Sequence, residues 1–435
     1  MKPSVIRVGI FDQIVSGGGV RLFTTKLLEA FSQLAGSKWH FHLMWPLFDS
    51  SNNFLPRPNL PNTSFERINV SEFSTIHNCV IPVLERISPS ENLYKKIDSR
   101  VFLRIKAYVN ETRKKEQQDL RSAGGLGLQW LDQRMGRFDL IYLPYPYLTL
   151  PREIEWHPSK PLVITLHDLA HEQTDAWGEM TKPLRHEVSR WTGISDLVIF
   201  SSDFIKNEAQ QLYDLPDERA RRIYLAHPES KNSHVTSIDV LARYNLSKGY
   251  IFSLGWAAKH KRVETILEGF ALFKERSKMN LSLVIAGPLT ENLFNRSAYG
   301  LEVGRDVFAL GYVKDEEVTS LYQHSSVVVT ASISEAGLNA VIFDAMHHGK
   351  AIICSNIPQF VERVGTDDSV ALIFDPYSPQ SLADAFSKHF SDPEQARIRV
   401  SKAKQFISFR NVSDVGQEYL DAFESVLLRR VNKRV

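Results

Sequence analysis

Residues 325–355 read SSVVVTASISEAGLNAVIFDAMHHGKAIICS, and this stretch decides the fold. The apolar runs 327–330 and 351–354 have the length and β-branched content of buried strands. Between them lie a loop of small and polar residues and a helical pattern that ends before Gly349. A strand, a loop, a helix and a second strand in this order predict a parallel βαβ unit, in which functional groups follow the carboxyl end of the first strand.

The same alternation of short apolar runs and helical stretches extends along the whole chain. In the first half, strands are predicted at 6–11, 40–45, 140–143, 162–166, 197–200 and 223–225. In the second half, they are predicted at 250–254, 281–286, 307–310, 327–330, 351–354 and 371–374. Since the two sets are similar in number and spacing, we expect an α/β fold of two Rossmann-like domains facing each other across a cleft.

The polar stretch 230–247 separates the two sets of strands. We therefore expect an acceptor-side domain at 1–235, with a basic helical insertion near 85–125, and a donor-side domain at 245–412. An amphipathic helix at 413–435 follows, and its pattern is compatible with packing against either domain.

Composition excludes several classes of protein. Lys and Arg number 52 against 50 Asp and Glu, a formal charge of +2, so nucleic acid is not an expected partner. The two cysteines, Cys79 and Cys354, lie far apart and form neither a disulfide framework nor a paired-cysteine metal motif, which favours a reducing cytoplasm. We expect a cytoplasmic protein, because no apolar run is long enough for a signal peptide or a membrane span.

Residues 94–121 form a basic segment with apolar residues at helical spacing. The simpler interpretation is a surface helix that is solvated on one face. The alternative is a helix that holds the protein on the inner face of a membrane, where it would meet anionic lipid or a lipid-linked acceptor.

Two polar motifs occur in the first half. Gly17, Gly18 and Gly19 precede a helical pattern and can bring the backbone close to an anion, although an ordinary strand-to-helix turn explains them equally well. His167 and Asp168 follow a strand, where α/β proteins place functional groups, and the alternative is that Asp168 caps a helix.

Two further motifs occur in the second half. Gly255 is followed by the cations of KHKR at 259–262 before a helix, which suits a phosphate or diphosphate unless the loop is merely solvated. Glu335 and Asp344 flank a helix start, and carboxylates accept hydrogen bonds from the vicinal hydroxyls of a sugar or ribose. A helix cap and a surface acid are the alternative interpretation of these two residues.

These motifs, in this order, resemble the retaining nucleotide-sugar glycosyltransferases of the GT-B fold, specifically family 4. The resemblance is best over GYVKDEEVTSLYQHSSVVVTASISEAGLNAVIFDAMHHGKAIICSNIPQFVERVG at 311–365 and FDPYSPQSLADAF at 374–386. LVITLHDLAHEQ at 162–173 and SDLVIFSSDFIK at 195–206 resemble the acceptor-side domain of that family.

The resemblance implies three catalytic residues: Lys261, which neutralises the departing diphosphate, Glu335, which holds the transferred sugar, and His167, which faces that sugar. It also implies a set of donor-binding residues, in which the glycines approach the diphosphate and Asp344 binds the ribose: Gly18, Gly19, Gly255, His260, Ala336, Gly337, Leu338, Asn339 and Asp344.

The chain departs from the family pattern at two places. Trp256 stands where the family usually has Arg, so the basic residue would be His260 instead. Glu335 and Asp344 have one residue more between them than the two family glutamates, and one extra residue in a helix rotates a side chain by about 100°.

The leading prediction is a transferase that moves a hexose from a nucleotide diphosphate sugar to a saccharide or lipid-linked saccharide, with retention of configuration. No cofactor and no metal are expected, because no DxD-like motif follows a strand. The motifs resemble those of members that use GDP-mannose or related hexoses. The alternatives are a catalytically inactive nucleotide-sugar or glycan-binding protein, and an epimerase or phosphorylase on the same fold, which account less well for these motifs.

Overall fold

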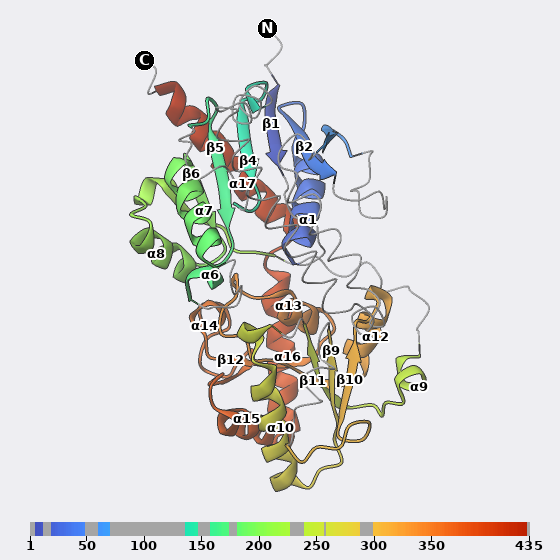
Figure 1. Cartoon of the computed structure of the whole chain (residues 1–435). Coiled ribbons are helices and arrows are strands. Elements are labelled where there is room, and N and C mark those ends of the chain that lie inside the picture. The colour runs from blue at the N-terminus through green and yellow to red at the C-terminus, as the bar shows by residue number, and fades with distance from the viewer. Residues whose placement is uncertain are drawn as a thin grey trace, which may run out of the picture. The chain divides into compact units, whose positions relative to one another are not determined.

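The structure is a computed structural model that describes residues 5–11, 19–47, 60–69, 135–146, 157–173, 181–226, 239–255, 258–287 and 299–432 (Figure 1). Its residues form two compact units. The first contains Met1–Thr165, Glu187–Val198 and Leu420–Val435, and the second contains Leu166–His186 and Ile199–Tyr419.

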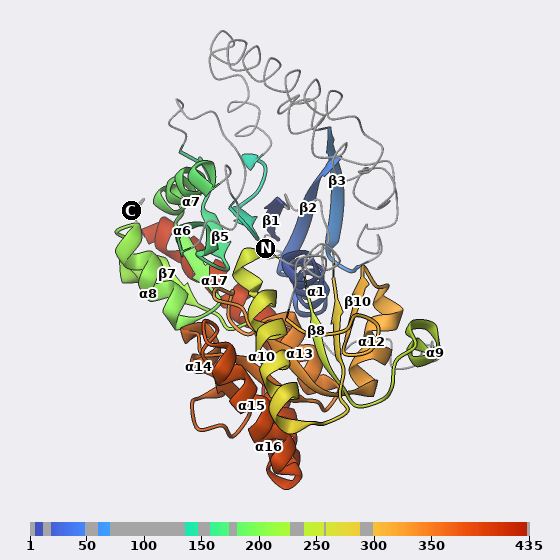
Figure 2. The ribbon, with the colours of Figure 1, turned by 60° about the horizontal axis from the view of Figure 1, so that its bottom comes forward.

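The first sheet has seven strands in the order β3-β2-β1-β4-β5-β6-β7 (Figure 2). The pairs that join β3 to β2, β2 to β1, β1 to β4 and β4 to β5 are parallel. Its strands are β1 (Ile6–Phe11), β2 (Trp39–Leu47), β3 (Thr63–Asn69), β4 (Leu140–Leu143), β5 (Leu162–Leu166), β6 (Leu197–Phe200) and β7 (Ala220–Arg222). The helices that accompany it in sequence are α1 (Gly19–Leu34), α6 (Ala170–Gln173), α7 (Thr181–Ile194) and α8 (Asp203–Leu212), with a 3₁₀ turn at Asp217–Arg219.

The second sheet has six parallel strands in the order β10-β9-β8-β11-β12-β13. Its strands are β8 (Tyr250–Leu254), β9 (Leu283–Ala286), β10 (Val307–Gly311), β11 (Ser325–Thr330), β12 (Ala351–Ser355) and β13 (Leu372–Phe374). Its helices are α9 (Val240–Tyr244), α10 (Val263–Ser277), α12 (Asp315–His324), α13 (Ala340–His347), α14 (Pro358–Val364), α15 (Pro379–Ser391), α16 (Pro393–Ser408) and α17 (Val412–Asn432), with a 3₁₀ turn at Lys259–Lys261. Both sheets have the strand order of a Rossmann fold.

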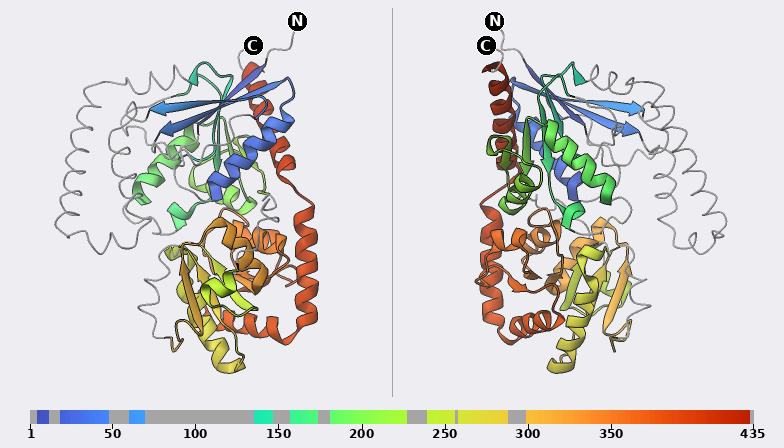
Figure 3. Two further views of the ribbon diagram at one scale, coloured as in Figure 1. Left: turned by 90° about the vertical axis from the view of Figure 1, so that its right-hand side faces the viewer. Right: turned by 60° about the vertical axis from the view of Figure 1, so that its left-hand side comes forward.

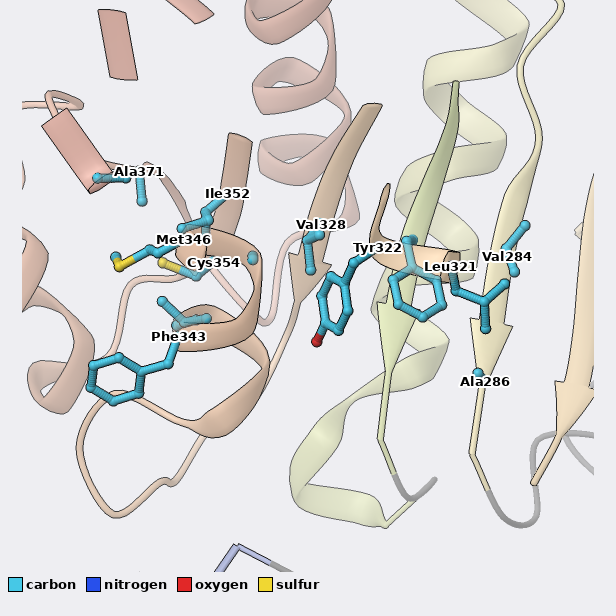
Figure 4. Packing of buried hydrophobic residues seen from close by; sticks show 14 of the residues in the cluster. Val284, Ala286, Leu321, Tyr322, Val328, Phe343, Met346, Ile352, Cys354 and Ala371 are labelled. Atoms are coloured by element: carbon cyan, nitrogen blue, oxygen red, sulfur yellow. The ribbon is translucent and has the colours of Figure 1, made fainter. Parts of the chain in front are cut away.

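Two hydrophobic clusters cover the two faces of the second sheet. Val328 packs in one of them, together with Tyr322 and Phe343 (Figure 4), whereas its neighbours Val327 and Val329 pack in the other. Successive side chains of a strand point to opposite faces, so a strand buried on both sides reads as a continuous apolar run. This explains why the run VVVT identified the strand in the sequence.

Part of α17 completes the core of the first compact unit. The Phe423 ring lies 5.8 Å from Phe31, 6.4 Å from Trp39 and 5.3 Å from Tyr142, measured between ring centroids. Arg430 forms an ion pair with Asp196 at 3.1 Å. Figure 3 shows this part of α17, drawn in red, alongside α1 and the first sheet.

The strand predictions are confirmed except at the first sheet's edges. Edge strand β3 was not predicted, and edge strand β7 lies at Ala220–Arg222 rather than at 223–225. Within the described part of the chain, no helix is both long enough and apolar enough to cross a membrane.

Candidate functional site

The second sheet reverses its strand order between β8 and β11, which lie side by side. In an open α/β sheet, ligands bind beyond the carboxyl ends of the strands at such a switch point. The segment after β8 contains Lys261, and the segment after β11 contains Glu335. The sheet topology therefore places two of the three predicted catalytic residues after the two strands at the switch point.

Glycines end the strands at this edge. Gly255 follows β8 with φ of 150°, and Gly287 follows β9 with φ of 146°. A Cβ atom on Gly287 would lie 1.8 Å from the carbonyl oxygen of Gly255. Only glycine at position 287 lets the two backbone segments come this close. With no side chain at Gly255 or Gly287, nothing from these two residues covers the backbone at the predicted diphosphate position.

The segments after β8 and β11 are bonded to each other. The backbone N–H of Ile333 donates to the carbonyl oxygen of His260 at 2.8 Å. The Lys261 ammonium donates to Oε1 of Glu335 and forms an ion pair with it. These contacts fix the cation and the carboxylate relative to each other before any ligand is present.

Three donors converge on one oxygen of the Glu335 carboxylate. Besides Lys261, the hydroxyl of Ser332 donates to Oε1 at 2.6 Å and the side-chain amide of Asn339 donates at 2.9 Å. The other oxygen, Oε2, accepts no hydrogen bond from the described residues. Since the side chain is 11% exposed, Oε2 is left to accept a bond from a ligand hydroxyl.

The pKa of Glu335 reflects competing effects. Burial raises the pKa of its carboxyl, but the charge of Lys261 and the hydrogen bonds from Lys261, Ser332 and Asn339 outweigh burial and hold the pKa below its usual value. Glu335 is therefore a carboxylate, and not a proton donor, at neutral pH.

Asn339 connects this carboxylate to a helix. Its side-chain oxygen accepts from the backbone N–H of Ile342 at 3.0 Å, so it is the N-cap of α13, while its amide nitrogen binds Glu335. Gly337 has φ of 138°, and a Cβ atom there would lie 3.3 Å from the Ser201 carbonyl oxygen in the same compact unit. Together with Ala336 and Leu338, Gly337 places backbone N–H groups just before the start of α13.

His260 is a partly buried neighbour of Lys261. Its Nδ1 atom is buried and has no hydrogen-bond partner among the described residues. Burial and the charge of Lys261 lower its pKa, although Glu335 acts in the opposite direction. The lowered pKa favours the neutral form of His260 at neutral pH, whereas the sequence suggested it as a basic substitute for the family arginine.

Asp344 lies on α13, one turn beyond its start. Burial raises the pKa of the Asp344 carboxyl to about 7. The pKa of Tyr322 is also raised, first by the burial of Tyr322 and then by the negative charge of Asp344. Its neighbours on either side, Phe343 and Ala345, belong to the hydrophobic cluster of Figure 4. Asp344 is thus half-protonated near neutral pH, which distinguishes it from Glu335.

His167 follows β5 and is 2% exposed. Its Nδ1 atom lies 3.1 Å from the hydroxyl of Ser201, which follows β6. Asp168 accepts a hydrogen bond at 3.0 Å from the backbone N–H of Ala170, the first residue of α6. In the same compact unit, the Ser334 hydroxyl donates to the side-chain oxygen of Gln173 at 3.0 Å, so the segment after His167 contacts the loop that holds Glu335.

Several predicted features lie elsewhere. Gly18, Trp256 and the basic segment 94–121 lie outside the described residues, and Gly19 is the first residue of α1 in the first compact unit. The search for three or more His, Cys, Asp or Glu side chains able to hold a metal found no such group in the part of the chain that the structure describes.

Ser332 was not among the site residues predicted from the sequence. Its signal was present, since a hydroxyl three residues before a loop carboxylate is within reach of that carboxylate in a tight turn. The structure shows that it is a direct partner of Glu335.

Comparison with known proteins agrees with this geometry. The family model described as Glycosyltransferase Family 4 matches residues 84–227, and the model described as Glycosyl transferases group 1 matches residues 242–406. O-antigen chain mannosyltransferase B of Escherichia coli is 25% identical over 266 residues, which is 58% of this chain and 68% of that protein.

Solved structures share the fold. Sucrose-phosphate synthase from Thermosynechococcus elongatus has a TM-score of 0.67 at 16% identity, covering 98% of this chain and 100% of the other. HepE of Anabaena, in complex with UDP and glucose, has a TM-score of 0.66 at 16% identity, covering 97% of this chain and 100% of the other.

The chain belongs to the glycosyltransferases of the GT-B fold. It is a glycosyltransferase that uses nucleotide sugars, so the alternatives that the sequence left open are decided in favour of a transferase.

Proposed function

We propose that this enzyme transfers a hexose from a nucleotide diphosphate sugar to a saccharide or lipid-linked saccharide, with retention of the anomeric configuration. The arrangement of Lys261 and Glu335 at the switch point is the observation that supports the proposal most. It combines a cation for a leaving diphosphate with a carboxylate that has one oxygen available for a sugar hydroxyl.

The chemistry requires stabilisation of negative charge. As the bond between the anomeric carbon and the diphosphate oxygen breaks, the sugar becomes oxocarbenium-like and charge develops on the departing nucleotide. We propose that three kinds of group stabilise this negative charge. They are the Lys261 ammonium, the backbone N–H groups at residues 336–338, and Nδ1 of His260, which has no partner among the described residues. Preorganised donors of this kind stabilise a transition state more than a ground state.

The donor in our proposal is a mannose nucleotide. The motifs resemble those of members that use GDP-mannose or related hexoses, and the relative from Escherichia coli is described as a mannosyltransferase. HepE was crystallised with UDP-glucose as well as with UDP, so a UDP-hexose is the competing donor. Because a ligand that binds only the folded state raises its stability, melting temperatures measured with GDP, UDP, ADP and their sugars will separate these donors.

The decisive test uses two lysines of the same turn. We expect Lys261→Ala to reduce release of nucleoside diphosphate by about 10² to 10³-fold, as loss of a preorganised transition-state donor does. Lys259→Ala is the matched control, since Lys259 is exposed, and it should retain activity. Equal activity of both variants, or no turnover of any donor by the unmodified enzyme, would contradict the proposal.

Retention and metal independence need separate measurements. NMR of the product shortly after mixing will show whether its new anomeric centre has the configuration of the donor, and inversion would refute retention. Treatment with EDTA should leave the rate unchanged, because Lys261 and backbone N–H groups occupy the role of a metal in our proposal. A rate that EDTA abolishes and Mg²⁺ restores would refute metal independence.

The acceptor belongs to polysaccharide synthesis in our proposal, as the description of the O-antigen relative suggests. The basic segment 94–121 is our candidate for contact with the inner face of a membrane. Sedimentation with anionic vesicles compares the chain with a variant in which Lys95, Lys96 and Arg100 are Gln. If the variant still binds the vesicles as the unmodified chain does, segment 94–121 is not the part that contacts the membrane.

A further inference from the structure

A hollow of about 920 Å³ lies along one face of α10, in the second compact unit. Glu268, Leu272 and Glu275 line it, and their spacing of three and four residues puts them on the same face of the helix. Two other segments complete the lining: residues 299–301, and residues 377–380 at the start of α15, which lies beside α10 (Figure 1). The volume is within the range of small-molecule sites, and none of these residues belongs to the glycosyltransferase site.

The segment before α15 presents an aromatic ring in a fixed position. Tyr377 is 62% exposed, although the guanidinium carbon of Arg262 lies 4.9 Å from the centroid of its ring. Its backbone N–H donates to Oδ1 of Asp375 at 2.9 Å. The hydroxyl of Thr265, on α10, donates to the carbonyl oxygen of Pro376 at 2.9 Å. These contacts hold the segment against α10 and leave the tyrosine ring accessible.

The second segment contributes another tyrosine. Tyr299 is partly buried and packs, together with Leu272 and Leu301, against the hydrophobic cluster that α10 shares with the second sheet. Burial, and then the nearby Glu268 carboxylate, raise the pKa of the Tyr299 hydroxyl. The hollow therefore combines apolar side chains, two aromatic rings and a hydroxyl that lies near a carboxylate.

The charges around the hollow nearly balance. Among the described lining residues, three are acidic, Glu268, Glu275 and Asp306, and two are basic, Lys274 and Arg305. Asp306 forms ion pairs with both cations, at 2.6 Å to Lys274 and 3.1 Å to Arg305. Since the cations are already engaged, the hollow is not arranged for an anion. Glu268 and Glu275 instead offer hydrogen-bond acceptors to an uncharged ligand.

From these observations we infer that the hollow binds a short, neutral oligosaccharide. Its sugar rings pack against Tyr299 and Tyr377, because the face of an aromatic ring carries partial negative charge and attracts the C–H groups of a pyranose. Its hydroxyls donate to the carboxylates of Glu268 and Glu275. The site is separate from the one that contains Lys261, and the inference does not depend on the donor or the acceptor of the proposed reaction.

Calorimetric titration of the full-length chain with mannotetraose and with maltotetraose tests the inference. We expect saturable binding of at least one of these neutral tetrasaccharides. Tyr299→Ala and Tyr377→Ala should each weaken binding by about threefold to tenfold, the loss expected for one aromatic contact. Tyr377→Phe keeps the ring and should keep the affinity.

Two matched variants locate the binding. Phe409→Ala removes an aromatic side chain that is 75% exposed in the same unit but does not line the hollow, and it should leave the affinity unchanged. Lys261→Ala should also leave the affinity unchanged, so failure of the proposed function and failure of this inference are distinguishable. Melting temperatures show whether Tyr299→Ala keeps the fold, and the exposed Tyr377 provides a test that does not depend on Tyr299. Absence of binding by both tetrasaccharides, or binding that both alanine variants at the tyrosines retain, would overturn the inference.

A basic peptide is the competing occupant, because Glu268 and Glu275 are acidic. Binding of a neutral saccharide should be the same at low and high salt, whereas binding of a cationic peptide weakens as salt screens the charges. Tetralysine, titrated in the same way, is the probe for the peptide. Tetralysine binding that Glu268→Gln and Glu275→Gln abolish, without binding of either tetrasaccharide, would replace the saccharide with a basic peptide.

Discussion

One oxygen of the Glu335 carboxylate accepts hydrogen bonds from Ser332, Asn339 and Lys261, whereas the other accepts none from the described residues. This difference between the two oxygens determines how the carboxylate can act. A carboxylate held by one oxygen presents the other in a fixed direction. Its lowered pKa keeps it charged, so it accepts hydrogen bonds and does not transfer protons at neutral pH. Ser332 is therefore a positioning residue in our proposal.

Ser332→Ala tests this positioning role. We expect kcat to fall by about tenfold, corresponding to the loss of one hydrogen bond to a charged group, with a smaller change in KM. Ser332→Thr keeps the hydroxyl and should recover much of the rate. If both substitutions lower kcat equally, crowding of the loop and not the hydrogen bond explains the loss.

Asp344 predicts a pH effect on stability. Its pKa is about 7 in the folded protein and near its ordinary value in the unfolded chain, so the folded state binds more protons between about pH 4 and 7. The stability associated with this proton is present below pH 4 and is lost as the pH rises through 7. We expect the unfolding free energy of the unmodified protein, relative to Asp344→Asn, to fall by on the order of 2 to 4 kcal/mol across this range.

Urea unfolding at a series of pH values measures that difference. Asp384→Asn is the control, because Asp384 is an exposed carboxylate of α15 whose side chain is 64% accessible. A parallel pH dependence in Asp344→Asn and the unmodified chain would show that Asp344 is not the group responsible.

The sequence predicted which residues meet at the switch point, but it did not predict their protonation states. The order of Lys261 and Glu335 after two strands was visible, because apolar runs and small-residue loops mark strand ends. The neutral form of His260 and the raised pKa of Asp344 were not visible, since both depend on burial by segments distant in sequence.

At the scale of elements, central strands were predictable and edge strands were not. β11 and β12 are buried on both faces, so they read as VVVT and AIIC. β3 reads TSFERIN and β7 reads ARR, and both lie at a sheet edge, where charged residues are tolerated. The prediction at 223–225 was therefore placed on the nearest apolar run, just after the true strand.

The glycine at the end of β9 provides a test at the same scale. Gly287→Ala would place a Cβ against the Gly255 carbonyl, at a φ that alanine rarely adopts, so we expect a loss of more than about 2 kcal/mol in unfolding free energy. Gly300→Ala is the matched control, because Gly300 has φ of 70° with nothing within 4 Å of the added atom, and it should cost only about 1 kcal/mol. Similar losses in the two variants would contradict the close approach.

At the scale of the whole molecule, α17 connects distant parts of the sequence. Its first residues belong to the second compact unit and those from Leu420 onward belong to the first. Phe423 is fully buried among Phe31, Trp39 and Tyr142. The core of the first unit is therefore closed by residues that come after the whole second sheet.

Phe423→Ala should lower the unfolding free energy of the first unit by about 3 to 5 kcal/mol, the cost of a large cavity in a packed core. Leu428→Ala on the same helix is the control, because Leu428 is 60% exposed and its loss should have little effect. Hydrogen exchange of amides in β1 and β4, compared with β8 and β11, will show whether the destabilisation is confined to the first unit. Uniform loss of protection in both sheets would show that the units do not unfold separately.

The position of Phe423 also sets an order of events during synthesis. The ribosome releases β1, β2 and β4 early, but the ring that covers Phe31, Trp39 and Tyr142 emerges only after β13 and α16. The strands of the second sheet, by contrast, follow one another in the sequence from β8 to β13. All six have therefore been synthesised before α17 is made. The unit whose first strands are made earliest is thus the last to be completed, and its aromatic residues Phe31, Trp39 and Tyr142 lack the Phe423 contact until α17 has left the exit tunnel.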